Sequence, residues 1–404
     1  MKGRVHMKRR LKIGLSLFLA MGILTSSGVA MSGGASELPP SHQVELVTLD
    51  SYIPFSVPAL EGVDNISTKQ ALIIDGVQNN LYCTFDDANA ACEDIVNKIP
   101  GLLNKVQSEY GLSELTPATV EQYNEKIIEY WQSLIDDGNE DVLGEYSDSH
   151  FSWICFKQIF DSYKENDEIV SNSFGSSMTR SSTSRAAVDE STLQKIGMLL
   201  PYTTPLAVQV DQQTQLQKQI STRTTVNGFN VENGTAYAKK HATDPNKADY
   251  KYFSNGDCTN FVSQILENGG IKQEVYDDEN LGWWHKKSTF LFITTHKQSL
   301  SWVSASTFAR YMGRSYPTTD FSAFSKKVQP GDFIAMDSTG KGNYHHMGYV
   351  TAVGSNVTQN GITYRNFQVA QHTNNYLAWC DTSTNGWDTG HGSTMYCIVR
   401  RAVS

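Results

Sequence analysis

The sequence has none of the short motifs that are typical of a zinc site. It contains no HExxH motif and no paired CxxC motifs, so the closely spaced ligands of zinc enzymes and zinc ribbons are missing. Histidine is nevertheless present in the C-terminal part of the chain, at His345, His346, His372 and His391. We therefore expect no metal and no cofactor, and a zinc hydrolase is the less favoured alternative.

Only one stretch of the chain is strongly apolar, and it is too short to span a bilayer by itself. It covers residues 13–24 and follows an N-terminus that contains six Lys and Arg residues. A basic start, an apolar centre and small residues afterwards are typical of a secretory signal peptide. We expect a signal peptide over residues 1–35, cleaved after Ala30 or Ala35, and a secreted or cell-wall-associated protein. An uncleaved N-terminal anchor is the alternative.

Positive charge is scarce in the rest of the chain. The formal net charge is −9, and residues 1–35 hold six positive charges and no Asp or Glu, so residues 36–404 have a charge near −15 (−9 minus 6). Nucleic acids and anionic membrane surfaces repel such a chain. We expect neither nucleic acid nor membrane as a partner once the signal is cleaved, and the oligomeric state stays open.

Cysteine is sparse as well. The six cysteines are Cys83, Cys92, Cys155, Cys258, Cys380 and Cys397. Export to an oxidising compartment permits disulfides. If Cys258 is reserved for chemistry, five cysteines remain and at least one stays unpaired. The pairing predicted most readily is Cys380 with Cys397, because both flank a loop near the C-terminus.

Residues 36–167 are predicted to form a mostly helical region. Its clearest helix covers residues 116–138, where Thr116 can cap the N-terminus and apolar residues recur at helical spacing. Further helices are expected over residues 86–99 and 151–164. No pattern of catalytic side chains stands out in this region.

Residues 168–225 are predicted to be a linker and connecting segment, because residues 168–187 are rich in Ser and Thr and have no apolar periodicity. The amino-acid composition and patterning change from residue 226. A helix is expected over residues 233–242, and short alternating runs predict strands over residues 331–337, 346–353, 364–373 and 394–403. Helices followed by antiparallel strands predict an α+β domain over residues 226–404.

The stretch SNGDCTNFVSQIL, residues 254–266, predicts an amphipathic helix that begins at a cysteine. One apolar face is formed by Cys258, Phe261, Val262, Ile265 and Leu266. Asn255 or Asp257 can cap this helix, and Gly269 ends it. Unpaired N–H groups and the positive end of the helix dipole stabilise a thiolate at Cys258, so the position suits a nucleophile. A buried structural thiol or one half of a disulfide is the alternative.

A nucleophilic cysteine needs a base, and two consecutive histidines precede a predicted strand. Successive side chains of a strand face opposite ways, so only one of His345 and His346 can face the cysteine helix. His346 shares its face with Gly348, whose small size leaves room for a packed helix. This favours His346 as the base. His345 is then a contact at the rim of a substrate cleft or a solvated residue.

The base in turn needs a polar partner on its second ring nitrogen. His372 stands near the end of the next predicted strand, where pairing of the two strands would bring it close to His346. We predict that His372 orients His346, with Asn374 as the second candidate. A surface polar residue at a strand end is the other interpretation of His372.

Several of these segments together resemble the putative amidase domain family of secreted bacterial proteins: YAKKHA, YKYFSNGDCTNFVSQILENGG, PGDFIAMD, HHMGYVTAV and VAQHT. The resemblance covers roughly residues 230–400. That family is similar to papain-like cysteine hydrolases, alongside the NlpC-type and CHAP peptidoglycan hydrolases. The resemblance implies a papain-like C-terminal domain, in which a helix that carries the cysteine packs on an antiparallel sheet.

The resemblance also implies roles for individual residues. Cys258 is the nucleophile in DCTNF, His346 is the base, and His372 is the third polar residue in QHT. The backbone N–H of Cys258 is expected to be one oxyanion donor, as the start of a helix favours. Candidates for the other oxyanion donor and for supporting positions are Tyr252, Asn255, Asp257 and Asn374.

The sequence therefore predicts a secreted cysteine amidase or peptidase that cleaves amide bonds through a thioester acyl-enzyme. Peptides are the expected substrates, and the resemblance implies the stem peptides of peptidoglycan. Trp283 and Trp284 are candidates for stacking on sugar or peptide in the cleft, with core packing as the alternative. A non-catalytic cell-surface binding protein with a degenerate papain-like domain is the competing hypothesis. The N-terminal region can be an inhibitory pro-region, a wall-targeting module or a partner-binding domain.

Overall fold

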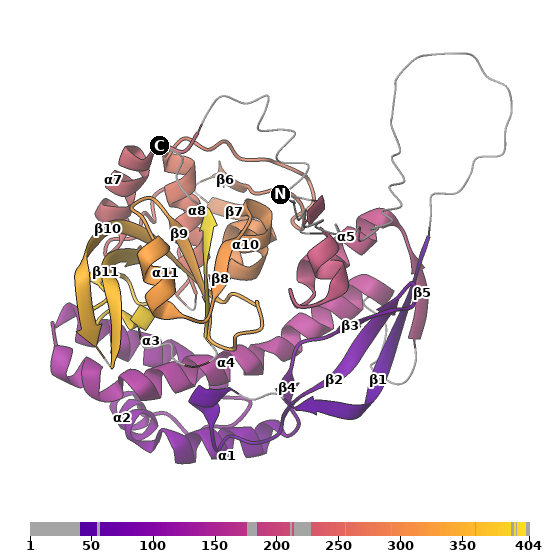
Figure 1. The fold of residues 1–404 in the computed structure, drawn as a ribbon, viewed down its shortest axis with the longest axis horizontal. Coiled ribbons are helices and arrows are strands. Elements are labelled where there is room, and N and C mark those ends of the chain that lie inside the picture. Colours follow the sequence, from indigo (N-terminus) through magenta and orange to yellow (C-terminus); the bar gives the residue numbers. More distant parts are fainter. Residues whose placement is uncertain are drawn as a thin grey trace, which may run out of the picture. The chain divides into compact units, whose positions relative to one another are not determined.

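An antiparallel sheet of six strands organises the C-terminal half of the protein in the computed structural model (Figure 1). The order across the sheet is β12-β11-β10-β9-β13-β8. These strands are β8 (Ser315–Thr318), β9 (Phe333–Asp337), β10 (His346–Gln359), β11 (Ile362–Gln371), β12 (Tyr376–Trp379) and β13 (Met395–Arg400). The four strands predicted from the sequence correspond to β9, β10, β11 and β13.

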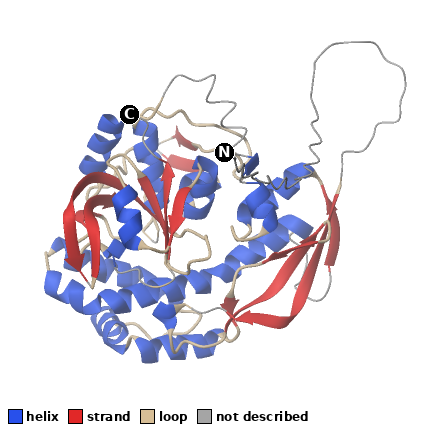
Figure 2. Ribbon diagram, viewed as in Figure 1, coloured by secondary structure: helices blue, strands red, loops and turns tan. Residues whose placement is uncertain are grey.

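Alternation of side chains gives this sheet two apolar faces, each covered by helices (Figure 2). The face that includes Tyr349 of β10 packs against helices α7 (Val231–His241), α8 (Cys258–Asn268) and α10 (Ala305–Met312). The face that includes Val350 of β10 packs against α11 (Phe321–Lys327). The C-terminal half is thus α+β, with helices on both sides of an antiparallel sheet.

The N-terminal region contains a second antiparallel sheet, which the expectation of a mostly helical region missed. Its order is β3-β2-β1-β5, and β4 also pairs with β2. The strands are β1 (His42–Pro54), β2 (Ile66–Ile74), β3 (Val77–Asn80), β4 (Thr84–Phe85) and β5 (Ser184–Val188). Both faces of β2 are largely buried, so the alternation that marks a half-exposed strand is weak in its sequence.

The helices of the N-terminal region pack on one another through a shared apolar core. They are α1 (Ala88–Lys98), α2 (Pro100–Tyr110), α3 (Val120–Asp136) and α4 (Glu140–Phe174). Thr119 rather than Thr116 flanks the start of α3. The helix expected over residues 151–164 is one part of α4, which has 35 residues. Helix α4 packs against α1 to α3 and against the N-terminal sheet, so its buried residues lie on more than one side and a single apolar stripe is weak in its sequence.

The prediction of a linker over residues 168–225 is wrong for most of the residues of this range that the structure describes. Residues up to Phe174 belong to α4, β5 pairs with β1, and α5 (Glu190–Leu199) follows. Ile169, Leu193 and Ile196 are buried in one core with Val44 of β1. Tertiary burial of these few apolar residues outweighs the Ser- and Thr-rich composition.

The remaining short elements lie in the C-terminal half, apart from η1. They are η1 (Pro58–Leu60), β6 (His285–Phe290), β7 (Ile293–Gln298), α9 (Leu300–Val303) and η2 (Gly386–Asp388). Strands β6 and β7 form a separate two-stranded sheet. Residues 40–404 make up one compact unit, so α3 and α4 of the N-terminal region have defined contacts with the central sheet.

The structure describes residues 41–54, 57–175, 184–210, 212–213, 228–254, 256–291, 293–359, 361–388, 392 and 394–400. The predicted signal peptide lies outside these residues, as do Asn255 and His391. Among the described residues, no helix combines the length and the apolar character that crossing a membrane requires.

Candidate active site

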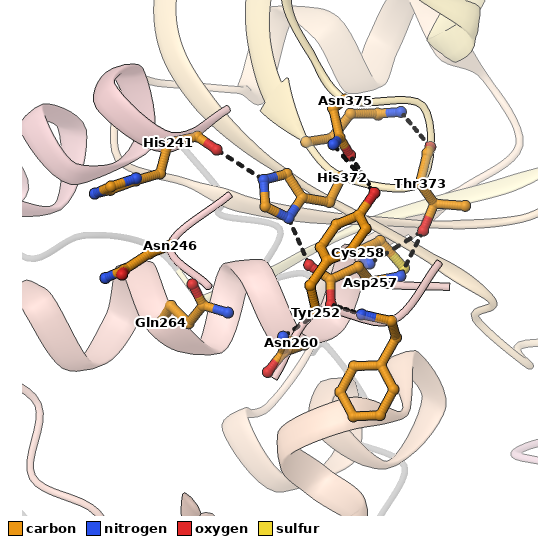
Figure 3. A network of polar contacts seen from close by, with 12 residues as sticks. His241, Asn246, Tyr252, Asp257, Cys258, Asn260, Gln264, His372, Thr373 and Asn375 are labelled. Atoms are coloured by element: carbon orange, nitrogen blue, oxygen red, sulfur yellow. Dashed lines mark hydrogen bonds and ion pairs between the residues drawn. The ribbon is translucent and has the colours of Figure 1, made fainter. Parts of the chain in front are cut away.

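Cys258 is the first residue of α8 and lies at one end of the central sheet. Asp257 precedes it, but the Asp257 side chain makes no capping hydrogen bond to the helix. Instead the backbone N–H groups of Asp257 and Cys258 donate to Thr373 Oγ1, at 2.7 and 3.2 Å (Figure 3). The Cys258 side chain is 6% exposed. The thiol therefore lies in a nearly enclosed space at a helix N-terminus.

The turn that carries Thr373 has an unusual backbone conformation. Thr373 and Asn374 lie in the turn between β11 and β12, with φ angles of 59° and 66°. Two consecutive positive φ angles are typical of a type I′ hairpin turn, which Asn and Gly favour. A β-branched residue is rare there, so Thr373 is held in a strained conformation by its surroundings. The strained turn aims the Thr373 hydroxyl at the start of α8.

His346 is the first residue of β10 and borders the same cavity as Cys258, and the two side chains shift each other's pKa. The predicted reason for choosing His346 is wrong, however. Gly348 lies on the sheet face opposite α8, where an added Cβ would stand 2.9 Å from Trp387 Cζ2, whereas Tyr349 is on the α8 face. His346 reaches Cys258 because both residues stand at the same end of the sheet.

Gln371, the last residue of β11, holds the His346 ring. His346 Nε2 and Trp387 Nε1 both lie 2.8 Å from Gln371 Oε1. An indole N–H can only donate, so this atom must be the carbonyl oxygen of the carboxamide, and His346 Nε2 must donate to it. Gln371 Nε2 donates in turn to the backbone oxygens of Thr373 and Asn374, at 3.4 Å each. Nδ1 is then the His346 nitrogen left to face the sulfur.

The pKa values of Cys258 and His346 are shifted in opposite directions. Burial is the largest influence on the Cys258 pKa and would raise it, but hydrogen bonding and the charge of His346, with smaller contributions from Thr259 and the Met347 backbone, lower it overall. Burial would lower the His346 pKa, yet the interactions with Cys258 and Gln371 raise it. The two groups stabilise each other as a thiolate and an imidazolium.

His372 does not contact His346, so the predicted orienting contact is wrong. Its Nδ1 lies 2.5 Å from Asp257 Oδ2 and its Nε2 lies 2.7 Å from the backbone oxygen of His241 (Figure 3). The ring is fully buried and stacks on Phe261, with the ring centroids 3.8 Å apart. Both ring nitrogens are engaged by these two partners, so neither is available to His346. His372 therefore joins the end of α7 to the start of α8.

The Asp257 carboxylate is turned away from the Cys258 thiol. In addition to His372, it accepts hydrogen bonds from the Phe253 backbone N–H at 3.0 Å and from Asn260 Nδ2 at 2.8 Å. The side chain is 1% exposed. Three donors thus hold this negative charge behind the helix start, where it does not oppose a thiolate from close range.

Most of the predicted oxyanion donors either bond to other groups of the protein or lie outside the described residues. The Cys258 N–H faces Thr373 Oγ1, and the Tyr252 hydroxyl lies 3.2 Å from Asn375 Nδ2. Asn255 lies outside the described residues. Asn374 does border the cavity beside Cys258, and its Oδ1 has no hydrogen-bond partner among the residues described. Thr373, which also borders this cavity, was not predicted.

The backbone of His345, and not its ring, lies beside the Cys258 thiol. Its carbonyl oxygen is 3.9 Å from Cys258 Sγ, and its Nδ1 accepts a long hydrogen bond of 3.4 Å from the Ser338 N–H. Burial, with a smaller contribution from the charge of His346, lowers the His345 pKa to about 3. His345 is therefore neutral near pH 7, and His346 is the histidine that can carry charge next to the thiol.

Two cavities meet at Cys258. The first, of about 220 Å³, is bordered by Trp131 of α3 and His150 of α4 as well as by His346 and Trp387. The second, of about 520 Å³, is bordered by residues of β3, α4 and the loop between β9 and β10. Cys258, Gly256, His345 and Gln158 border both cavities. The N-terminal region, in which no catalytic pattern was recognised, thus forms one wall of the site.

Trp283 and Trp284, the predicted cleft aromatics, belong to the core. They are 1% and 2% exposed, and neither borders the two cavities that meet at Cys258. Trp283 Nε1 donates to Ser263 Oγ at 3.0 Å, and its ring stacks on Trp302 with centroids 4.8 Å apart. The indole N–H groups find partners inside the fold, so these residues pack behind α8.

The six cysteines are buried free thiols, so the expected Cys380–Cys397 disulfide is not formed. Burial raises the pKa of Cys397 to about 12, and the pKa of Cys380 is also raised by burial. Cys258 differs from both because its pKa is lowered. In the described part of the chain, no three His, Cys, Asp or Glu side chains are grouped so that they could hold a metal ion.

Sequence reasoning missed Gln371, Thr373 and Trp387. Gln371 is adjacent to the predicted orienter, and a shift by one residue in a strand moves a side chain to the other face. The pairing of Tyr349 with Ala370 fixes which residue of the QHT motif faces His346. Trp387 is far along the chain, and no local signal connects it to the site.

Comparison with known proteins supports an amidase domain in the C-terminal half. Residues 228–398 match the model of the family described as "Putative amidase domain". The chain is 33% identical to "Uncharacterized protein YhbB" of Bacillus subtilis (strain 168) over 118 residues, 29% of this chain and 35% of that protein. It is 50% identical to "Uncharacterized protein YjcM" of the same organism over 48 residues, 12% of each chain. The chain thus spans about a third or less of these curated relatives. No solved structure gives a significant match.

Proposed function

We propose that this protein is a secreted cysteine amidase or peptidase that hydrolyses amide bonds in peptides. The observation that carries the proposal is the pairing of a cysteine of lowered pKa with a histidine of raised pKa at the N-terminus of α8. The matching amidase-domain model over residues 228–398 supports hydrolysis of an amide bond. Peptidoglycan stem peptides are the substrate class that we propose.

The first half of the reaction forms a thioester. The Cys258 thiolate attacks the amide carbonyl carbon, and a C–S bond forms as the carbonyl π electrons move to oxygen. The His346 imidazolium gives its Nδ1 proton to the amide nitrogen as the C–N bond breaks, and the amine leaves. Gln371 keeps the ring in place throughout, because its Oε1 accepts from Nε2 in both protonation states.

The second half restores the enzyme. The neutral His346 ring takes a proton from a water molecule at Nδ1, and the hydroxide oxygen attacks the thioester carbon. The C–S bond then breaks and the carboxylic acid product leaves. Cys258 is again a thiolate, and His346 is again an imidazolium because it holds the proton taken from water. The raised His346 pKa favours this charged resting pair.

Thr373 is our candidate for the oxyanion donor. Its Oγ1 accepts from two backbone N–H groups, so its own hydroxyl proton is directed elsewhere, and the residue borders the cavity beside Cys258. A hydroxyl that is oriented by two donors costs little to reorganise when charge develops on the substrate oxygen. Loss of one such donor typically lowers kcat by about 10²- to 10³-fold.

Incubation with purified peptidoglycan tests the function directly. The protein, and Cys258→Ala as a matched variant, would be incubated with intact peptidoglycan and with its soluble stem peptides. Mass spectrometry of the products identifies the bond that is cleaved. We expect new amine and carboxylate ends with the protein and none with Cys258→Ala.

Two outcomes contradict the proposal. Equal product formation by the protein and Cys258→Ala would show that the sulfur is not the nucleophile. A Cys258 thiol that iodoacetamide modifies no faster than the other buried cysteines at pH 7 would show that no thiolate is present. The second result would favour a non-catalytic binding protein, and inhibition by a chelator alone would favour a zinc hydrolase.

A further inference from the structure

Gln158 of α4 lies at the point where the two cavities meet. Its Nε2 donates to the Asn343 backbone oxygen at 3.0 Å and lies 3.3 Å from Asp337 Oδ1, while Ser338 Oγ donates to its Oε1 at 2.5 Å. The residue borders both cavities, as does Cys258. A chain that passed over the Cys258 sulfur from one cavity to the other would have to displace this side chain.

Gln132 of α3 makes a second contact of the same kind, with Asn375, two residues along the chain from Thr373, whose hydroxyl accepts from the Cys258 N–H. The Asn375 N–H donates to Gln132 Oε1 at 2.6 Å, and Gln132 Nε2 donates to the Asn375 backbone oxygen at 3.2 Å. Asn375 directly precedes β12, the terminal strand of the six-stranded sheet. Its neighbours Asn374 and Tyr376 border the first cavity.

Both contacts are made by a carboxamide, which carries the same donor and acceptor as a peptide group. Gln132 bonds to the N–H and the C=O of one residue, as adjacent antiparallel strands do in a hydrogen-bonded pair. An extended peptide that lies beside a terminal strand uses these same backbone groups. Gln132 and Gln158 therefore occupy positions that the backbone of an extended peptide can fill.

We propose that the backbone N–H and C=O of Asn375 on one side of Cys258, and the Asn343 backbone oxygen with the Ser338 hydroxyl on the other, bind an extended peptide substrate across the sulfur. In the described state, Gln132 and Gln158 of the N-terminal region hold these groups, so α3 and α4 act as an intramolecular competitor of the substrate. This inference rests on the proposed function and adds to it the conformation of the substrate and a means of regulation.

The contacts of the covering helices are consistent with a layer that can move. Gln132 and Gln158 are only partly buried, and a further contact at this interface is the hydrogen bond from Thr384 Oγ1 to Glu140 Oε1, of 2.8 Å. Each of these is a polar contact that water or substrate can replace, and Ile135 of α3 adds a partly buried apolar contact with the C-terminal core. Between these contacts the two cavities leave space next to Cys258. The core of the N-terminal region is built by α1 to α4 themselves, so its packing does not depend on these polar contacts.

Variants of the full chain test the proposal. Gln132→Ala/Gln158→Ala removes both carboxamides, and Gln122→Ala on the exposed side of α3 is the matched control. Gly144→Cys/Ser383→Cys fixes α4 in place by a disulfide, because an ideal Cβ at Gly144 lies 3.4 Å from Ser383 Oγ. The single variant Gly144→Cys controls for oxidation of other thiols.

The readout is the rate at which Cys258 is alkylated, located by mass spectrometry. Three reagents are compared: iodoacetamide, iodoacetyl-tetraalanine amide, and the same reagent built from N-methylglycine, which has no backbone N–H to donate. In the double Gln→Ala variant we expect the tetraalanine reagent to react at least fivefold faster than in the unmodified protein and in Gln122→Ala. We also expect it to react at least tenfold faster than the N-methylglycine reagent.

The disulfide variant should react at least tenfold more slowly with the tetraalanine reagent, and a reductant should restore the rate. Equal rates for the two peptide reagents would overturn peptide-backbone binding. A lower tetraalanine rate in the double Gln→Ala variant, with a normal rate in the disulfide variant, would overturn competition and show that α3 and α4 build the substrate site. Rapid reaction with iodoacetamide in every variant keeps the proposed function intact in both cases, whereas uniformly slow reaction would refute the proposed function itself.

Discussion

Replacement of Gln371 by Ala isolates the residue that connects the candidate base to the core. Gln371 is 3% exposed, and its Oε1 accepts from both His346 Nε2 and Trp387 Nε1. The substitution removes both hydrogen bonds and leaves two buried donors without this acceptor. It also removes the two donations from Gln371 Nε2 to the backbone oxygens of Thr373 and Asn374, so a shift in the His346 pKa, and not the rate alone, identifies the effect on His346.

The magnitude follows from the two lost hydrogen bonds. A hydrogen bond to a charged group such as the His346 imidazolium contributes about 1.5–3 kcal/mol. At about 1.36 kcal/mol per factor of ten, its loss predicts a decrease in kcat/KM of about 10- to 150-fold. The unsatisfied Trp387 N–H destabilises the fold by about 1–3 kcal/mol more, which a denaturant titration would measure separately.

The assay is the pH dependence of Cys258 alkylation and of peptide hydrolysis. The hydrogen bond to Gln371 raises the His346 pKa, so the His346 pKa falls when Gln371 is replaced by Ala. The imidazolium is then lost at a lower pH, and the alkaline limb of the hydrolysis profile shifts to lower pH. The acid limb, where the thiolate of Cys258 first forms beside a protonated His346, should stay in place.

Gln371→Glu is the control for the His346 bond, because a carboxylate of the same length can still accept from His346 Nε2 and Trp387 Nε1, although it loses the donation to the Thr373 and Asn374 backbone oxygens. It should shift the alkaline limb to higher pH, opposite to Gln371→Ala, since a negative charge stabilises the imidazolium. An unchanged alkaline limb in Gln371→Ala, with stability lowered as expected, would refute the positioning role and leave Gln371 with a structural role only.

Three further predictions concern residues around the site. His372→Ala should lower the free energy of unfolding by about 3–5 kcal/mol, measured in urea, because it leaves the buried Asp257 carboxylate without this partner; a change in the pH midpoint of Cys258 alkylation would contradict its separation from His346. Gly348→Ala should lower hydrolysis at least tenfold, since its Cβ would displace Trp387, and unchanged Trp fluorescence and activity would refute this. Alkylation of the unfolded chain without reductant, followed by mass spectrometry, should modify all six cysteines, and five or fewer would indicate a disulfide.

The local pattern of the sequence was sufficient for the element that carries the sulfur. The apolar spacing after Cys258 and the glycine at position 269 predict a helix that begins at the cysteine, and α8 runs from Cys258 to Asn268. Strands β9, β10 and β11 were likewise predictable from short apolar alternation. These features depend on neighbours in the chain, and hydrophobic periodicity reports them directly.

The choice between adjacent residues was not predictable in this way. His346 and His345, or Gln371 and His372, differ by one position, and strand register decides which of each pair faces the sulfur. That register is set by the pairing of Tyr349 with Ala370 and by the packing of Trp387 beside Gly348. The sequence argument for His346 assumed that α8 packs on the Gly348 face of the sheet, whereas α8 packs on the opposite face.

The sequence by itself determined that a cysteine would stand at a helix N-terminus near a histidine-bearing strand, because both follow from spacing along a few residues. Only the tertiary structure decided that Gln371 holds His346, that His372 pairs with Asp257, and that α3 and α4 lie over Cys258. Each of these contacts joins residues that are far apart in the chain or that differ by one step of register. Burial and hydrogen bonding in the folded structure determine these contacts, and hydrophobic periodicity along the sequence does not reveal them.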